Sequence, residues 1–298
     1  MRKSLWLRCL PGLSALAALV ALAAGCSSLD ERQREWIFQP GERSWPGGSA
    51  AAQGMDDVWI EFDATAGHGT PVRLHGLWLA AARPDAPLLL YLHGARFDVR
   101  GSAPRMRRMQ ELGFAVLAVD YRGFGQSSKA LPSEASAIED ARAAWDWLGR
   151  QHPGRPRYLF GHSLGGAIAV SLAAEVQQQA AGLIVEGSFT SIPEVAGSYR
   201  WGWLPGSWLG PWITQRFDAA SRIGRLKMPV LVVHGSEDDI IKPALGRALY
   251  ERANPPKRFV LVEGGSHHNT NTLGLAQYRA ALADLFGLRP SGAPAAGG

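Results

Sequence analysis

Cysteine is scarce in this sequence, which has two cysteines among 298 residues, both within the first 26. A disulfide-stapled scaffold is therefore excluded. Internal repeats, heptads and low-complexity tracts are also absent, and the one long apolar run, residues 9–24, is too short for a membrane-spanning helix. With 46% hydrophobic and 19% charged residues, the composition does not match a disordered, collagen-like or multi-pass membrane protein. The length suffices for one large α/β domain or two small ones.

The first 25 residues carry three basic side chains and no acidic one, and their apolar run ends in small residues. This pattern predicts a secretory signal peptide. Residues 22–26 (Leu-Ala-Ala-Gly-Cys) resemble a bacterial lipobox, which implies that the thiol of Cys26 is acylated and that cleavage leaves it as the new N-terminus. An ordinary signal peptide cleaved near Ala24 is the alternative. Ser27 after the cysteine implies sorting to the periplasmic side of the outer membrane.

The net charge of +5 is mostly a property of this signal, because its removal takes three basic residues and leaves +2. Such a surface predicts no nucleic-acid partner, and the expected membrane contact is the N-terminal lipid anchor. Residues 26–55 are polar and interrupted by glycine and proline, so we expect them to tether and wrap the domain. Residues 288–298 are predicted to form a disordered tail. The oligomeric state is left open.

From residue 56 to residue 287, short apolar runs alternate with helix-like segments. The first two runs alternate like antiparallel strands, and the later, near-continuous runs are typical of parallel strands buried on both faces. The predicted strands are 58–62, 72–80, 88–92, 114–119, 158–160, 183–185, 230–233 and 259–262, and the predicted helices are 133–151, 164–177, 243–252 and 272–286. This alternation predicts a doubly wound, mostly parallel α/β sheet of about eight strands.

A serine stands between a predicted strand and a predicted helix, in the sequence Gly-His-Ser-Leu-Gly over residues 161–165. The two glycines are needed because the serine occupies a strained turn where larger side chains would clash with the strand and the helix. The turn places the hydroxyl of Ser163 at the top of the sheet, in front of the helix N-terminus. We therefore predict Ser163 to be a nucleophile.

Three consecutive acidic residues, Glu237, Asp238 and Asp239, follow the predicted strand 230–233. A serine hydroxyl is a weak nucleophile that needs a base and an acid to orient that base, and in this arrangement the chain order is serine, acid, histidine. Asp238 is the favoured acid because it stands three residues after the glycine that ends the strand. Asp239 is the nearest alternative, while Glu237 and Glu186, which ends an earlier strand, are weaker candidates.

Two adjacent histidines, His267 and His268, follow the last predicted strand in a Gly-Gly-Ser-His-His loop. The order along the chain and the place at the sheet edge both fit a catalytic base. We prefer His267, because a loop of this kind presents its first histidine. His268 either lines the pocket or faces solvent.

Two backbone donors are needed for the oxyanion that develops during acyl transfer. One is the N–H of Leu164, which follows the nucleophile at the start of a helix. The other is expected from the loop after strand 88–92, where Ala95 is the predicted donor and Arg96 the neighbouring alternative. His93 in the same loop is interpreted as a structural residue.

Four stretches together resemble α/β-hydrolases of the serine aminopeptidase and prolyl-oligopeptidase-like branch, across roughly residues 70–287. They are Leu92-His93-Gly94 and residues 120–127, 161–166 and 234–238. The resemblance implies the α/β-hydrolase fold and a Ser–His–Asp hydrolase without a metal or organic cofactor. It also implies a structural role for the loop 120–127, so Asp120 and Arg122 are assigned no catalytic function.

The segment 192–228 is predicted to be a minimal cap over the site, rich in tryptophan. Its aromatic side chains either pack the cap onto the sheet, line an apolar substrate pocket, or face a membrane. The cap tryptophans are Trp201, Trp203, Trp208 and Trp212.

We expect a hydrolase that cleaves a carboxylic ester or related acyl bond of a small molecule through an acyl-enzyme. The same machinery acting on an amide or peptide is the first alternative, although no acidic cluster for a free amine is evident. A non-catalytic lipoprotein that retains the fold is the second, and the intact serine, acid and histidine positions argue against it.

Overall fold

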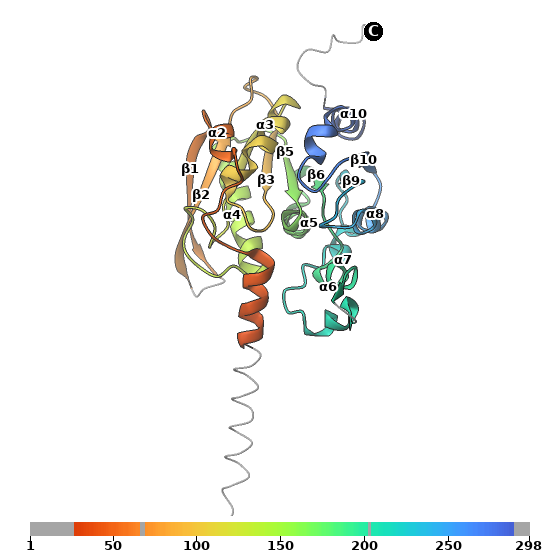
Figure 1. The fold of residues 1–298 in the computed structure, drawn as a ribbon. Helices are drawn as coiled ribbons and strands as arrows, with labels where there is room; N and C mark the ends of the chain where they lie inside the picture. Colours follow the sequence, from red (N-terminus) through yellow and green to blue (C-terminus); the bar gives the residue numbers. More distant parts are fainter. Residues whose placement is uncertain (1–26, 66–68, 202–203, 289–298) are drawn as a thin grey trace, which may run out of the picture.

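The computed structural model describes residues 27–65, 69–201 and 204–288. Its main sheet has eight strands in the order β1-β2-β4-β3-β5-β6-β9-β10, with helices on both faces (Figure 1). Only β1 with β2 and β2 with β4 pair antiparallel, and the other neighbours are parallel. The predicted doubly wound, mostly parallel sheet of about eight strands is therefore confirmed.

The strands of this sheet lie close to the predicted ranges. They are β1 (Asp56–Ala64), β2 (Thr70–Leu79), β3 (Leu88–Leu92), β4 (Ala115–Val119), β5 (Arg157–His162), β6 (Ala180–Glu186), β9 (Val230–Gly235) and β10 (Lys257–Val262). Every residue of β3, β4 and β9 is buried, as expected for central strands that are covered on both faces.

The helices frame the sheet and also include elements that the sequence did not predict. They are α2 (Gly48–Ala51), α3 (Ala103–Glu111), α4 (Glu134–Gln151), α5 (Leu164–Val176), α7 (Ala219–Ile223), α8 (Pro243–Arg252), α9 (Thr270–Leu273), α10 (Leu275–Phe286) and the 3₁₀ turn η1 (Val99–Ser102). Residues 27–38 are helical as well. The helix predicted over 272–286 is divided at Gly274, where a Cβ would approach Val262 Cγ2 to 2.6 Å.

The cap contains α6 (Ile192–Gly197), the short strands β7 (Arg200–Trp201) and β8 (Leu204–Pro205), and the 3₁₀ segment η2 (Gly206–Trp212). Its aromatic side chains do not share one role, because Phe217 is fully buried while Trp208 and Trp212 are 65% and 69% exposed. The Oη of Tyr199 donates to the carbonyl oxygens of Asp239, at 2.9 Å, and Ile240. This contact ties the cap to the loop that carries the predicted acid. Trp203 lies outside the described residues.

The N-terminal segment 27–55 packs onto the domain that follows it. The Phe38 side chain is fully buried, and its carbonyl accepts the backbone N–H of Arg96 at 2.9 Å. Arg34 donates from Nε to the carbonyl of Pro132 at 2.9 Å. Among residues 27–65, 69–201 and 204–288, no helix is long and apolar enough to cross a bilayer. Cys26 and residues 289–298 lie outside the described ranges.

A buried histidine links the first two strands to the loop after β4. The Nε2 of His75 lies 2.7 Å from Asp57 Oδ1, and its Nδ1 lies 3.3 Å from Asp120 Oδ2. Burial alone would lower the pKa of His75, but the two carboxylates outweigh it and raise the pKa above the ordinary 6.5. The protonated form of His75 therefore stabilises the folded state.

We expect the stability advantage of the wild type over a His75→Gln variant to be largest below pH 6.5, where His75 is charged in both states. The advantage should shrink as the pH rises through the raised pKa of the folded state, because the folded protein then loses its proton. Urea denaturation of both proteins between about pH 6 and pH 9 measures the difference. A difference that stays constant or grows over this range would contradict the assignment.

Candidate active site

Ser163 occupies a sharp turn between β5 and α5. Its backbone has φ 55° and ψ −124°, a conformation that residues with a side chain adopt rarely. The flanking glycines permit the turn: a Cβ at Gly165 would lie 2.1 Å from the carbonyl oxygen of Leu92, and one at Gly161 would meet Gly165 at 2.2 Å. The serine is thus held at the carboxyl end of β5, directly before the N-terminus of α5, as the sequence predicts.

Asp238 and His267 meet at the carboxyl ends of β9 and β10. The Nδ1 of His267 lies 2.8 Å from Asp238 Oδ2, while Asp238 Oδ1 accepts the backbone N–H groups of Ile240 and Ile241 at 3.0 and 2.8 Å. Burial would raise the pKa of Asp238, but the hydrogen bonds from His234 and His267 outweigh it and hold the pKa well below its usual range. Asp238 is therefore a carboxylate at neutral pH.

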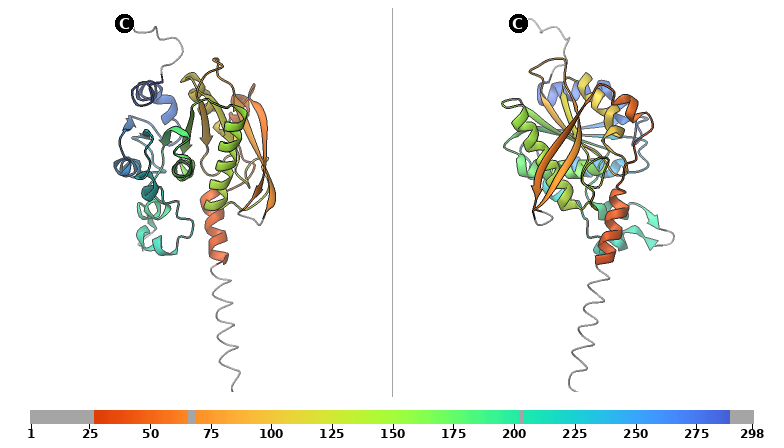
Figure 2. Two further views of the ribbon diagram at one scale, coloured as in Figure 1. Left: turned by 180° about the vertical axis from the view of Figure 1, so that it is seen from behind. Right: turned by 90° about the vertical axis from the view of Figure 1, so that its left-hand side faces the viewer.

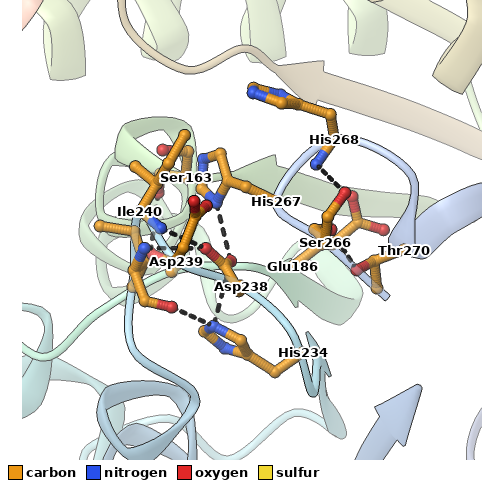
Figure 3. A network of polar contacts seen from close by, with 12 residues as sticks. Ser163, Glu186, His234, Asp238, Asp239, Ile240, Ser266, His267, His268 and Thr270 are labelled. Carbon is orange, nitrogen blue, oxygen red and sulfur yellow. Dashed lines mark hydrogen bonds and ion pairs between the residues drawn. The ribbon is translucent and has the colours of Figure 1, made fainter. Parts of the chain in front are cut away.

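The imidazole of His267 lies between Ser163 and Asp238 (Figure 3). The structure thus brings together the three residues that the sequence singled out, from loops separated by 75 and 29 positions. The alternatives do not form this contact. The side chains of Asp239 and Glu237 are exposed, while His268 lines the cavity beside Ser163, as one of its two expected placements, and packs against Trp45 with their ring centroids 4.7 Å apart.

The two residues predicted to be oxyanion donors lie on either side of Ser163. Leu164 is the first residue of α5, and the loop containing Ala95 passes so close that a Cβ at Gly94 would lie 3.0 Å from Ser163 Cβ. The backbone N–H of Arg96, the alternative donor, is bonded to the Phe38 carbonyl instead. Among the described residues, no backbone carbonyl accepts the N–H of Ala95. The geometry therefore leaves Ala95, rather than Arg96, available to an oxyanion.

A cavity of about 230 Å³ opens beside Ser163. Its wall combines apolar side chains, including Trp45, Phe97 and Ile240, with the cations Arg96 and Arg105. None of the described residues that line it is an aspartate or a glutamate. In the described part of the chain, no group of three or more His, Cys, Asp or Glu side chains could hold a metal ion.

A buried ion pair supports the loop that carries His267. Arg105 Nε donates to Glu186 Oε1 at 2.8 Å, and Arg105 Nη2 donates to the carbonyl oxygens of His267 and His268 at 3.0 and 3.1 Å. The hydroxyl of Tyr278 donates to the other carboxylate oxygen of Glu186. Glu186 is therefore engaged behind the site and does not contact the His267 ring as its acid partner.

Arg105 is not recognisable from the sequence alone. It lies on α3, a helix with two further arginines at 107 and 108, and nothing in that run distinguishes the one that turns inward. His162 is also part of this layer, with Nε2 3.0 Å from the carbonyl of His267. Burial and the neighbouring Arg105 cation lower the pKa of His162 well below its ordinary value, so its ring is neutral beside the site.

The sequence profile of the family described as serine aminopeptidase, S33, matches residues 83–215 and 207–272. The chain belongs to this family. It is therefore a serine hydrolase. A protein of Mycobacterium tuberculosis (strain CDC 1551 / Oshkosh), described as uncharacterized, is 34% identical to this S33-family hydrolase over 264 residues, which cover 87% of this chain and 89% of the relative.

The lysophosphatidylserine lipase ABHD12 of Rattus norvegicus is 30% identical over 223 residues. The match covers 70% of this chain and 51% of the rat protein, so this S33-family hydrolase spans about half the length of that relative.

Solved structures establish the fold of this S33-family hydrolase. The Pyrococcus furiosus esterase Pf2001 has a TM-score of 0.63 at 19% identity and covers 84% of this chain and 98% of its own. Est1E of Butyrivibrio proteoclasticus, solved with ferulic acid, has a TM-score of 0.60 at 20% identity, with 74% and 95% covered. The predicted α/β-hydrolase fold is confirmed.

Proposed function

We propose that the protein hydrolyses carboxylic esters through an acyl-enzyme intermediate. The observation that carries this proposal is the 2.8 Å contact between His267 Nδ1 and Asp238 Oδ2, with the ring placed beside Ser163. Because the Asp238 carboxylate accepts the proton on Nδ1, the Nε2 of His267 is left as the basic nitrogen. The ionised Asp238 then stabilises the imidazolium that forms when His267 takes up a proton.

In the first half-reaction, Ser163 Oγ attacks the ester carbonyl carbon while its proton passes to His267 Nε2. The N–H groups of Leu164 and Ala95 bind the oxyanion of the tetrahedral intermediate. The bond to the leaving oxygen then breaks, and His267 donates its proton to release the alcohol. Water repeats these steps on the acyl-enzyme, which frees the carboxylic acid and restores Ser163.

The charges around the cavity favour an ester over a peptide with a free amino terminus. An ammonium group would need a carboxylate partner, and the described cavity wall contains Arg96 and Arg105 but no aspartate or glutamate. The relatives described as lysophosphatidylserine lipases support a lipid ester as the substrate class. Hydrolysis of an amide by the same residues is the second candidate, favoured only by the aminopeptidase description of the family.

We further propose that Cys26 carries a diacylglyceryl anchor and that the enzyme is held on the periplasmic side of the outer membrane. The sequence pattern of residues 22–26 and the serine that follows support this placement. Metabolic labelling with a palmitate analogue should mark the wild type and leave a Cys26→Ala variant unmarked.

A fluorophosphonate probe tests the proposed nucleophile, because it reacts with serines that a neighbouring base activates. The full chain in detergent should be labelled, and the Ser163→Ala variant should not. Ser198→Ala, which removes an exposed hydroxyl bonded to the Val195 carbonyl on the cap, is the matched control and should label like the wild type. Labelling that persists in a folded Ser163→Ala protein would overturn the assignment.

A further inference from the structure

The cap presents large apolar side chains to the outside of the molecule. Trp208, Leu209 and Trp212 are 65%, 42% and 69% exposed, and all three belong to η2. Two tryptophans with this exposure on one short segment are unusual, because such side chains are normally at least half covered in a folded protein. We therefore expect another molecule to cover this part of the surface.

The segment that carries these side chains is fastened to the N-terminal helix, residues 27–38. Gln33 Nε2 donates to the carbonyl of Trp212 at 2.7 Å, and Gln33 Oε1 accepts the N–H of Thr214 at 2.9 Å. Asp30 Oδ1 accepts from Thr214 Oγ1 at 2.7 Å and from Gln215 Nε2 at 2.8 Å. These four hydrogen bonds hold the exposed tryptophans at a set position relative to the start of the helix.

The start of this helix and the cap lie at the same end of the molecule, away from α10 (Figures 1 and 2). Leu29, in the first described turn, is 39% exposed. We call the set Leu29, Trp208, Leu209 and Trp212 the docking face.

We propose that the docking face inserts into the interface of a phospholipid bilayer. The 26 residues that precede the described helix contain the apolar run 9–24 and Cys26. The inference rests on the anchor proposed above for Cys26: with that residue acylated, the membrane-bound part of the chain ends directly before residue 27. The bilayer is thereby brought to the helix start, beside which the tryptophans are fastened.

The chemistry of the face matches the headgroup region of a bilayer. Tryptophan prefers that region because its ring is apolar while its N–H can bond to headgroups and water. The nearby exposed charges are mixed, with Arg32 and Arg216 accompanied by Glu31 and Glu35. Insertion should therefore depend on apolar burial and change little with salt.

Quenching by brominated lipid tests the proposal on the full chain. The protein is reconstituted into phosphatidylcholine vesicles with or without bromine on the acyl chains, and tryptophan fluorescence is compared. The double variant Trp208→Phe/Trp212→Phe removes the two reporters but keeps apolar rings, so we expect it to lose about half or more of the wild-type quenching. Trp59→Phe, on β1 at the sheet edge, is the matched control and should leave the quenching unchanged.

Equal quenching in the wild type and the double variant would show that the docking face points away from the bilayer, and would overturn the proposal. A second result would also overturn it: no quenching by brominated lipid, together with a dimer in detergent that the double variant Trp208→Ser/Trp212→Ser dissociates. The docking face would then bind a second copy of the chain. Melting temperatures of all variants exclude unfolding as the cause. The result is independent of esterase activity, because it reports only where the two side chains lie.

Discussion

Ser163→Ala should lower kcat for p-nitrophenyl butyrate by about 10⁵-fold or more, and His267→Ala should have an effect of the same order. The reason is that the two residues act in one step: the hydroxyl attacks only as its proton leaves for the imidazole. For the same reason, the double variant should be no slower than either single variant. Initial-rate measurements on four purified full-length proteins, the wild type and the three variants, determine the losses.

Two neighbouring carboxylates supply a matched control for this experiment. Asp238→Asn should cost about 10⁴-fold in kcat, because an amide at this position no longer accepts the Nδ1 proton and favours the wrong tautomer of His267. Asp239→Asn, one residue further on and exposed, should change kcat by less than about threefold. Losses that add up in the Ser163/His267 double variant, or a larger loss at Asp239 than at Asp238, would contradict the proposed roles.

Glu186→Gln should lower the free energy of unfolding by about 3–5 kcal/mol, because it leaves the buried Arg105 guanidinium without its counter-charge. Glu186 is fully buried, so water cannot compensate for the loss. Glu175→Gln, which breaks the exposed 3.2 Å pair with Arg142, is the matched control and should cost less than about 1 kcal/mol. Urea denaturation of the three proteins gives the comparison.

The double variant Arg105→Met/Glu186→Leu distinguishes the contribution of this ion pair to stability from its contribution to the position of the His267 loop. Exchanging both charges for apolar side chains should restore most of the lost stability. The kcat of this variant should nevertheless fall below that of the wild type, because the carbonyl oxygens of His267 and His268 lose their donor. A double variant with wild-type kcat would show that Arg105 does not position the His267 loop.

Local sequence patterns were sufficient to predict the sheet and the turn that carries Ser163. Strands such as β3 and β4 are continuous apolar runs, and the glycines around Ser163 are demanded by contacts near 2 Å that any side chain would make. Asp238 was favoured over Asp239 by its distance from the strand end. In the structure this spacing buries Asp238 and directs it at His267, while Asp239 is exposed.

What the sequence did not indicate depends on contacts between distant segments. Arg105 reaches the carbonyl of His267 across 162 positions, and no periodicity of α3 marks it among its neighbouring arginines. The helix over residues 27–38 was likewise not predicted, because much of what holds it is side-chain bonding to the cap some 180 positions later. The pattern of a single sequence shows which residues lie near each other along the chain, but it does not show which distant residue a side chain such as Arg105 or Gln33 contacts.

The hydrogen bond between the Phe38 carbonyl and the Arg96 N–H links the helix of residues 27–38 to the loop beside Ser163. Gln39 adds a second link, since its Oε1 accepts from Arg96 Nε at 3.1 Å. The N-terminal helix is therefore coupled to the loop that contains Ala95. Cleavage after residue 39 would remove both links and loosen the loop that contains Ala95. If the proposed anchor and esterase activity are correct, release of the domain from the membrane by such a cut should therefore lower its activity.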